Sequence, residues 1–299
     1  MDYSHKQTEK MLKELEKEIE AGYNKAIKTM KKEMQKLLER VKFEENPQRA
    51  YAQLQRLKRI DALIKQMTND LANANKIATQ IMNDELIDVY EVNYNFSAYS
   101  IEKLLVSNLN FTVMNKQVIK SILADETNPF ALLAIDELKD KVSIHKALKR
   151  ELFTGILAGE SINKIAQRIG KIVEADKNRA LKIARTETTR VQNSARFDTM
   201  KHAEKQGLKI LKSWVATGDA RTRKSHLAIN GETVPLHEEF SNGLQFPADT
   251  GGHASEVINC RCTMVTEFAD LEKTKEELEL DEALKDMEFE EWLNRENNN

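Results

Sequence analysis

The N-terminal 45 residues constrain the fold most, because their apolar residues recur at steps of three and four. The apolar positions are Leu12, Leu15, Ile19, Tyr23, Ile27, Met30, Met34, Leu37 and Val41. Lys and Glu residues lie between them, many of them four apart. This spacing predicts one long amphipathic helix over about residues 7–45, with coiled-coil-like periodicity. Such a helix needs a partner for its apolar face, from this chain or from a second copy.

A second long helix is expected to follow. Pro47 predicts the end of the first helix, and a new apolar stripe then runs from about Gln48 into the nineties. The pattern stays helical over 90–145, with breaks predicted at 93–97 and 125–129. Residues 1–145 are therefore predicted to form a helical arm, either a coiled coil or a bundle.

The pattern changes after residue 145. A short helix is predicted between Ser161 and Gly170, and then a long polar helix from about Ala175 that Gly207 caps. Period-two patterns predict strands at about 208–217 and 256–265, and Asn230 with Gly231 predicts a type I′ hairpin turn. The predicted fold class is α+β. It comprises the helical arm, a small α+β domain over 146–268 and an acidic helical tail over 269–299.

Charge limits the partners that this chain can be expected to have. Lys plus Arg, 46 in number, nearly balance 48 Asp plus Glu. The chain shows no signal-peptide core and no apolar run of about 20 residues, so we expect a cytoplasmic chain with no membrane partner. Between 145 and 212, however, basic residues exceed acidic ones. Candidate contacts to the phosphates of double-stranded DNA in this segment are Lys164, Arg168, Lys171, Lys177, Arg179 and Lys182.

The two cysteines of the chain, Cys260 and Cys262, are one residue apart. In a strand both sulfurs would face the same side. With an imidazole they could form a tetrahedral metal site, for which zinc is the candidate ion and His226 the candidate third ligand. His237 and His253 are further candidate imidazoles. Two alternatives stay open: both cysteines are small core residues, or one is a nucleophile with a histidine base.

Charged residues cluster at two other places. Asp219, Arg221 and Arg223 follow the predicted strand that carries Trp214, and they could bind an anion or fix the turn through an Asp–Arg pair. Polar residues on the preceding helix, namely Arg185, Glu187, Thr189 and Arg190, would line a face that we expect to be solvated. The sequence has no phosphate-binding glycine loop, serine elbow or His-Glu-x-x-His helix, so no enzyme is predicted.

The order of these motifs is more specific than any one of them. An Ala-Arg-Thr-Glu helix is followed by a tryptophan strand, an Asp-x-Arg segment that ends in histidine, an Asn-Gly turn, a Phe, a Pro and a closing Asn-Cys-Arg-Cys. In this chain the motifs are Ala184–Glu187, Trp214, Asp219–His226, Asn230–Gly231, Phe240, Pro247 and Asn259–Cys262. Over about residues 145–268 the chain thereby resembles the Mu F-like phage minor head proteins, also called phage head morphogenesis proteins.

This resemblance implies a function in the virion. It implies a minor capsid protein that enters the procapsid through the portal protein and acts in head assembly, DNA packaging or ejection. The expected location is the capsid interior near the portal, after synthesis in the host cytoplasm. The expected partners are the portal protein, the major capsid or scaffold protein, double-stranded phage DNA and further copies of this chain. Alternative functions are a metal- or thiol-dependent hydrolase or nuclease that uses His226, Cys260 and Cys262, and a non-specific DNA-binding protein.

Overall fold

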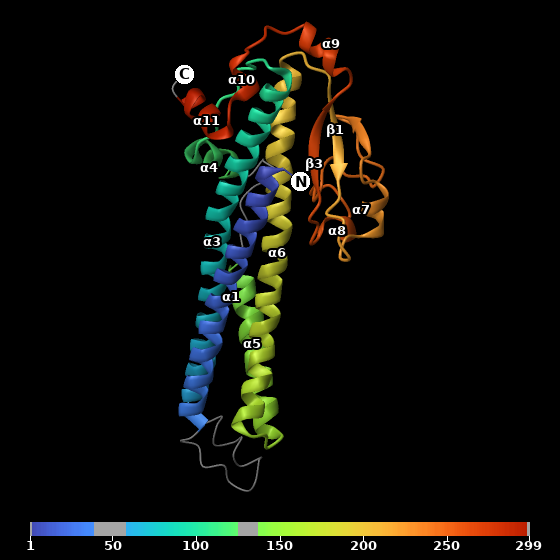
Figure 1. Cartoon of the computed structure of the whole chain (residues 1–299). Helices are drawn as coiled ribbons and strands as arrows, with labels where there is room; N and C mark the ends of the chain where they lie inside the picture. Colours follow the sequence, from blue (N-terminus) through green and yellow to red (C-terminus); the bar gives the residue numbers. More distant parts are fainter. Residues whose placement is uncertain (1, 39–57, 125–136, 298–299) are drawn as a thin grey trace. The chain divides into compact units, whose positions relative to one another are not determined.

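The structure is a computed structural model that describes residues 2–38, 58–124 and 137–297 (Figure 1). Its helices and strands, in chain order, are α1 (Tyr3–Leu38), α3 (Lys58–Leu105), α4 (Lys116–Ala124), α5 (Glu137–Leu157), α6 (Ile162–Lys205), β1 (Ile210–Val215), α7 (Lys224–Ala228), β2 (Thr233–Pro235), α8 (Ala254–Val257), β3 (Thr263–Phe268), α9 (Leu271–Glu276), α10 (Ala283–Asp286) and α11 (Phe289–Asn297). The predicted α+β class is confirmed. Within these ranges, no helix has the length and apolar character that crossing a bilayer requires.

The chain forms two compact units, each assembled from segments that are distant in the sequence. The bundle unit consists of Leu15–Met82 and Leu133–Leu181. The sheet unit consists of Met1–Glu14, Asn83–Leu132 and Lys182–Asn299. The bounds of α1, α3 and α6 show that each of these long helices contributes residues to both units.

In the bundle unit, α1, α3, α5 and α6 lie side by side (Figure 1). The apolar stripe of α1 is buried there, and Leu15, Ile19, Met30 and Met34 are each 1% exposed. Polar contacts tie the other helices together: Thr68 on α3 lies 3.4 Å from His145 on α5, and Arg168 on α6 donates to Glu151 on α5 at 3.1 Å. Helices of the same chain therefore cover the apolar face of α1 in this unit.

Two predicted helix breaks are wrong. Helix α3 continues through 93–97, because buried partners satisfy the polar residues that suggested a break: the Asn93 amide donates to Thr8 Oγ1 at 2.7 Å and to the Val89 carbonyl at 2.9 Å. Helix α6 continues through Gly170, which does not take the positive φ of a helix-ending glycine. Gly207 does, with φ of 91°, and α6 ends where predicted. The predicted breaks at Pro47 and at 125–129 lie outside the described residues.

The sheet has the strand order β2-β1-β3, and both pairs are antiparallel. The strand predicted around Trp214 is confirmed as β1. The hairpin predicted around Asn230 and Gly231 is wrong. The residues before the turn belong to helix α7, which ends at Ala228, and the strand after it, β2, pairs with β1. Gly231 has a φ of 82° and donates from its backbone N–H to the Trp214 carbonyl at 2.8 Å, so this turn instead directs the chain from α7 into β2.

The closing strand is shorter than predicted. Residues 254–257 form helix α8, and β3 begins only at Thr263. Asn259, with a φ of 57°, turns the chain between them, a conformation that Asn tolerates better than most residues. Both cysteines consequently lie in the connection before β3 rather than inside a strand.

The acidic tail is helical, as predicted, but it forms three short helices that belong to the sheet unit. Trp292 on α11 is fully buried and its indole N–H donates to Glu102 on α3 at 2.7 Å. Around it, aromatic rings of Tyr99 and Phe289 make further contacts. The tail is therefore anchored onto α3.

Candidate functional site

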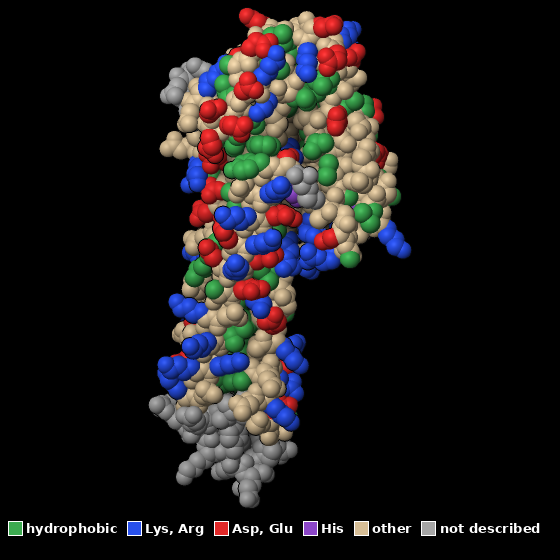
Figure 2. Space-filling view, in the orientation of Figure 1, with side chains coloured by type: hydrophobic (Ala, Val, Ile, Leu, Met, Phe, Trp, Pro, Cys, Tyr) green, Lys and Arg blue, Asp and Glu red, His purple; other side chains and the backbone are tan. Residues whose placement is uncertain are grey.

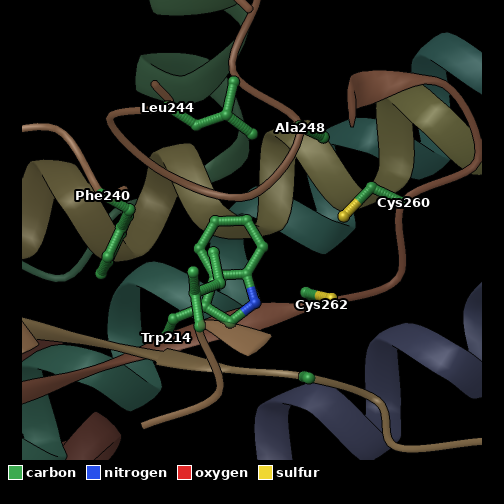
Figure 3. Packing of buried hydrophobic residues seen from close by; sticks show 8 residues of the cluster. Trp214, Phe240, Leu244, Ala248, Cys260 and Cys262 are labelled. Carbon is green, nitrogen blue, oxygen red and sulfur yellow. The ribbon is translucent and has the colours of Figure 1, made fainter. Parts of the chain in front are cut away.

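The cysteines lie in the core of the sheet unit, beside the buried tryptophan of β1 (Figure 3). Trp214 contacts Phe240 and His226 edge to face, with ring centroids 5.2 Å away in both cases. The remaining members of this core are Ala216, Ile229, Leu244, Ala248, Cys260 and Cys262. The thiols are thus enclosed by apolar groups on one side, and the imidazole of His226 approaches them on another.

His226, Cys260 and Cys262 converge although they are up to 36 residues apart in the chain. The Nδ1 atom of His226 lies 3.4 Å from the Cys262 sulfur and 3.6 Å from the Cys260 sulfur. The three side chains are 1%, 1% and 2% exposed. The structure therefore brings together the three residues that the sequence proposed as metal ligands, and they are the only such group of His, Cys, Asp and Glu ligand atoms in the described ranges.

An acidic residue that the sequence analysis did not select holds the histidine in place. Glu256, on α8, has its Oε2 atom 2.9 Å from Nε2 of His226. The same carboxylate accepts a hydrogen bond of 3.0 Å from the Ser225 hydroxyl. An imidazole that donates from Nε2 to a carboxylate keeps its Nδ1 lone pair, and that lone pair faces the two sulfurs.

Side chains of α6 fix the backbone of the cysteine segment. The Thr186 hydroxyl accepts from the Asn259 N–H at 3.0 Å, and the Thr189 hydroxyl donates to the Cys260 carbonyl at 2.6 Å. One helical turn further, the Asn193 amide donates to the Cys262 carbonyl at 3.1 Å. Side chains along one face of α6 thus hold the backbone of Asn259, Cys260 and Cys262.

The expectation of a solvated helix face is therefore wrong for Thr189 and Arg190, whereas Arg185 and Glu187 are half-buried. Thr189, Arg190, Gln192, Asn193 and Arg196 are all buried. A polar helix face is stable inside a protein when every donor and acceptor finds a partner. Here the backbone and side chains of the cysteine segment and of β3 supply many of those partners, which explains why the sequence is polar at buried positions.

The charged cluster after β1 forms a turn with a bidentate ion pair. Asp219 accepts from two guanidinium nitrogens of Arg261, at 2.7 and 2.6 Å. These hydrogen bonds hold the pKa of the Asp219 carboxyl well below its usual range. Of the predicted cluster, Arg221 is exposed and lies 3.7 Å from Asp219, whereas Arg223 donates to the Ile258 carbonyl. Arg261, the residue between the two cysteines, was not among the predicted site residues.

The other predicted residues lie apart from the thiols. Glu187 pairs with Arg190 on α6, and the half-buried Arg185 lies one turn before Thr189. His237 is exposed and lies 2.6 Å from Glu204. His253 is exposed at the N-terminus of α8, where its ring accepts from the Ser255 N–H. Neither histidine joins the cluster.

The candidate DNA-contacting residues differ in their exposure and ion pairing. Arg168 makes ion pairs with Glu160 at 2.7 Å and with Glu151 at 3.1 Å, and Lys177 pairs with Glu174 at 2.9 Å. Lys164, Lys171, Arg179 and Lys182 are exposed. On the face shown in Figure 2, Lys and Arg lie among Asp and Glu, so that face offers no uniformly basic surface.

The thiols also differ in acidity. The hydrogen bond from Cys260, and after it the contact with His226, lower the pKa of the Cys262 thiol below its usual range. The same thiol–thiol hydrogen bond and burial raise the pKa of Cys260. Two cysteine sulfurs beside an imidazole nitrogen form a donor set suited to a soft or borderline cation. The burial of all three side chains leaves little room for a polymeric substrate to reach a sulfur.

Comparisons with known proteins agree with the resemblance seen in the sequence. Residues 146–265 match the family described as phage Mu protein F like protein. The chain is 26% identical over 265 residues to the minor head protein GP7 of Bacillus phage SPP1, which covers 87% of this chain and 84% of that protein. No solved structure matches the chain.

Two further relatives match over a smaller part. The chain is 36% identical over 134 residues to the NAD(+)–arginine ADP-ribosyltransferase EFV of Enterococcus faecalis, which is 44% of this chain but 26% of that protein. It is 26% identical over 131 residues to protein YqbB of Bacillus subtilis, which is 42% of each. The matched family segment begins within α5 and ends within β3. It contains α6, β1, β2, the start of β3 and the cluster of His226, Cys260 and Cys262. Over residues 146–265 the chain is therefore similar to the phage Mu protein F-like proteins.

Proposed function

We propose that this chain is a minor head protein of a phage, which joins the procapsid through the portal protein and acts in head assembly, DNA packaging or ejection. The observation that carries the proposal is the similarity to the SPP1 minor head protein over 87% of the chain, which includes the helical region outside the family segment. A relative that was similar only over the cysteine-containing domain would not indicate a function for the long helices.

The structure supports an interaction role over a catalytic one. The strongest candidate for chemistry, the cluster of His226 and the two cysteines, is buried in the core of the sheet unit. A nucleophile must be reachable by its substrate. The name of the EFV protein gives an ADP-ribosyltransferase activity to that protein, whereas the part shared with this chain is 26% of its length.

The long helices offer the surface for partners. Their apolar faces are buried within the bundle unit, so their exposed faces are charged and polar. Contacts to the portal protein, to the capsid or scaffold protein, or to further copies would then be largely electrostatic, and such contacts weaken as salt rises. The capsid interior near the portal is the location that this role requires.

The proposal is tested in the phage that encodes the chain. A phage that lacks the gene is complemented with the full chain, and purified procapsids and virions are analysed by mass spectrometry, with DNA content and ejection measured on the same particles. We expect the chain in the particles and lower head yield, DNA content or ejection without it. Wild-type particles that do not contain the chain would contradict the proposal.

Docking to the portal protein is tested by co-expression. The portal protein of the same phage and the full chain are co-sedimented at low and moderate salt, and the expected complex weakens with salt. No association at either salt concentration would contradict portal docking while leaving a head role through another partner.

Binding to DNA can be separated from this role. The double variant Lys164→Ala and Lys171→Ala removes two exposed charges from α6, and Lys28→Ala with Lys32→Ala removes two from α1 as a matched control. If α6 binds phosphates, only the first variant should weaken binding to duplex DNA. The slope of the logarithm of the binding constant against the logarithm of salt concentration should also become shallower, by about one for each phosphate that is no longer neutralised.

A further inference from the structure

We propose that His226, Cys260 and Cys262 bind one zinc ion, and that Glu256 orients the histidine for it. The proposal concerns an ion that holds α7 to the segment before β3. It does not depend on the role of the chain in the phage head.

The first observation is the mutual geometry of the donors. For a tetrahedral zinc with ordinary bond lengths to sulfur and nitrogen, the two donor atoms lie about 3.6 Å apart. The separations between His226 Nδ1 and the two sulfurs are 3.4 and 3.6 Å, and all three atoms lie within 4.8 Å of one another. A single ion could bind all three at once. Without an ion, the one lone pair on Nδ1 can accept a hydrogen bond from only one of the two thiols.

The second observation is the state of the histidine. A metal-binding imidazole usually donates its other N–H to a carboxylate, which fixes the tautomer and the ring orientation. Glu256 occupies this position at 2.9 Å from Nε2, and Ser225 in turn donates to Glu256. The Nδ1 lone pair of His226 is thereby directed at the sulfurs and not at solvent.

The third observation is a buried donor without an acceptor. The indole N–H of Trp214 is fully buried and has no hydrogen-bond partner in the described part of the chain. In Figure 3 the indole nitrogen lies on the side of the ring that faces Cys262. An unpaired buried N–H costs about 1–3 kcal/mol. A zinc-bound thiolate keeps lone pairs that can accept this hydrogen bond, so metal loading would remove the unpaired group.

The fourth observation is that the ligands are held before any ion binds. Thr186, Thr189 and Asn193 fix the backbone on both sides of Cys260, and Asn259 turns the chain toward it with a positive φ. A site whose ligands are positioned by surrounding hydrogen bonds loses little entropy on binding. Three protein donors leave one coordination position of a four-coordinate zinc for a small ligand such as water.

Zinc is the expected ion because of the donor types. Thiolate sulfur and imidazole nitrogen select zinc over magnesium and calcium, which prefer oxygen. The burial of all three ligands favours a structural role, in which metal binding contributes to the stability of the sheet unit.

The experiment is the metal content of the full chain, purified under reducing conditions and measured by native mass spectrometry against the denatured mass. We expect one zinc per chain in the wild type and in His237→Ala, which removes an exposed histidine outside the cluster. Cys262→Ser is expected to lose the ion. Glu256→Gln is expected to keep the fold and to weaken zinc affinity by about 10- to 100-fold in a chelator competition.

Loading with Co²⁺ provides a second readout. Four-coordinate cobalt bound to thiolate gives intense absorption bands, and we expect them in the wild type and in His237→Ala but not in Cys262→Ser. If Cys262→Ser does not fold, the zinc content of the wild type and the zinc affinity of Glu256→Gln still test the proposal. Apoprotein with two free thiols that takes up neither metal, or a disulfide between the cysteines after purification with reductant, would overturn the proposal. Equal zinc affinity in wild type and Glu256→Gln would overturn the role of Glu256.

Discussion

The side-chain oxygen of Asn193 on α6 accepts a hydrogen bond from the backbone N–H of Met264 at 3.1 Å, and both residues are fully buried. The amide nitrogen of the same side chain donates to the Cys262 carbonyl at 3.1 Å. One asparagine therefore satisfies two backbone groups on either side of Thr263, where β3 begins. The matched family segment contains both the helix and this strand start.

Asn193→Ala should be strongly destabilising, because it leaves a buried N–H and a buried carbonyl without partners. Each unsatisfied group costs about 1–3 kcal/mol, so we expect a loss of about 2–5 kcal/mol in the free energy of unfolding. Urea unfolding followed by tryptophan fluorescence measures it. Asn24→Ala, at an exposed position of α1, is the control and should change the free energy by less than about 1 kcal/mol. Equal effects of the two variants would contradict this account.

The ion pair between Asp2 and Arg196 should make stability depend on pH in the acid range. Burial alone would raise the pKa of Asp2, but the charge and hydrogen bonds of Arg196, with hydrogen bonds from His5 and Ser4, outweigh it and lower the pKa from 3.8 to about 2. A lowered folded-state pKa gives stability that is present above pH 4 and is lost as pH falls toward 2.

Asp2→Asn tests this contribution. It should lose up to about 2 kcal/mol relative to wild type at pH 7, and the difference should vanish near pH 2. Urea unfolding of both proteins across this pH range is the measurement. Asp61→Asn, at an exposed position of α3, should show no such pH-dependent difference. A difference that stays constant from pH 7 to pH 2 would show that the aspartate acts through packing and not through its charge.

Because of Lys212, the free energy of unfolding should rise with pH in the alkaline range. The Lys212 ammonium lies 3.1 Å from Gln245 Oε1 and over the rings of Phe197 and Phe240, and the side chain is fully buried. Burial lowers the pKa of Lys212 from 10.5 to about 8, although acidic residues such as Asp249 act in the opposite direction. Between pH 8 and 10.5 the unfolded chain binds more protons at this residue, so stability rises with pH.

Lys212→Met removes this titration while it keeps the volume of the side chain. The free energy of unfolding of wild type, relative to Lys212→Met, should rise by up to about 3 kcal/mol between pH 7 and pH 10.5. Thermal or urea unfolding at several pH values checks it, and Lys209→Met, at the exposed residue just before β1, serves as the control. A difference in the free energy of unfolding between wild type and Lys212→Met that does not change with pH would contradict the lowered pKa of Lys212.

Trp292 should anchor the acidic tail. Trp292→Ala removes a fully buried ring and the hydrogen bond to Glu102, and substitutions of this kind cost about 3–5 kcal/mol. Because the tail helices are short, we expect this destabilisation to appear as local release of α11. Limited proteolysis should then cleave the tail faster. Leu280→Ala, at an exposed position in the tail, should be cleaved at the wild-type rate. Equal protection of Trp292→Ala and wild type would contradict the anchoring role.

The sequence correctly predicted those elements whose signals come from residues close together in the chain. The apolar stripe of α1, the strand around Trp214 and the helix end at Gly207 all follow from spacing or from the backbone preferences of a few neighbouring residues. These predictions required no knowledge of what packs against the element, and the structure confirms each of them.

The wrong predictions share a different cause. Asn93 suggested a helix break, yet its amide reaches Thr8, which is 85 residues away in the sequence. Thr189 was placed on a solvated face, yet its partner, the Cys260 carbonyl, is 71 residues further along the chain. Polar side chains in a helix can face water or a buried backbone, and only the tertiary partner distinguishes these cases.

The candidate site was predictable in part. The residue types and their order led to His226, Cys260 and Cys262, which the structure brings together. Glu256 and Arg261 were missed, because a single acid or base near a cysteine is common in any sequence. The recurrence of Thr186, Thr189 and Asn193 on one face of a helix, in a chain that also carries a cysteine motif, is the signal that could have identified the positioning residues.

The hydrogen bonds from α6 to Met264 have a consequence for how copies of this chain meet. β3 is an outer strand of its sheet, and an outer strand with free N–H and carbonyl groups invites another strand to pair with it and to aggregate. At Met264 the side chains of Asn193 and Arg196 occupy the N–H and the carbonyl. The start of this edge is closed to strand addition, so a strand of a second copy cannot pair with β3 at Met264.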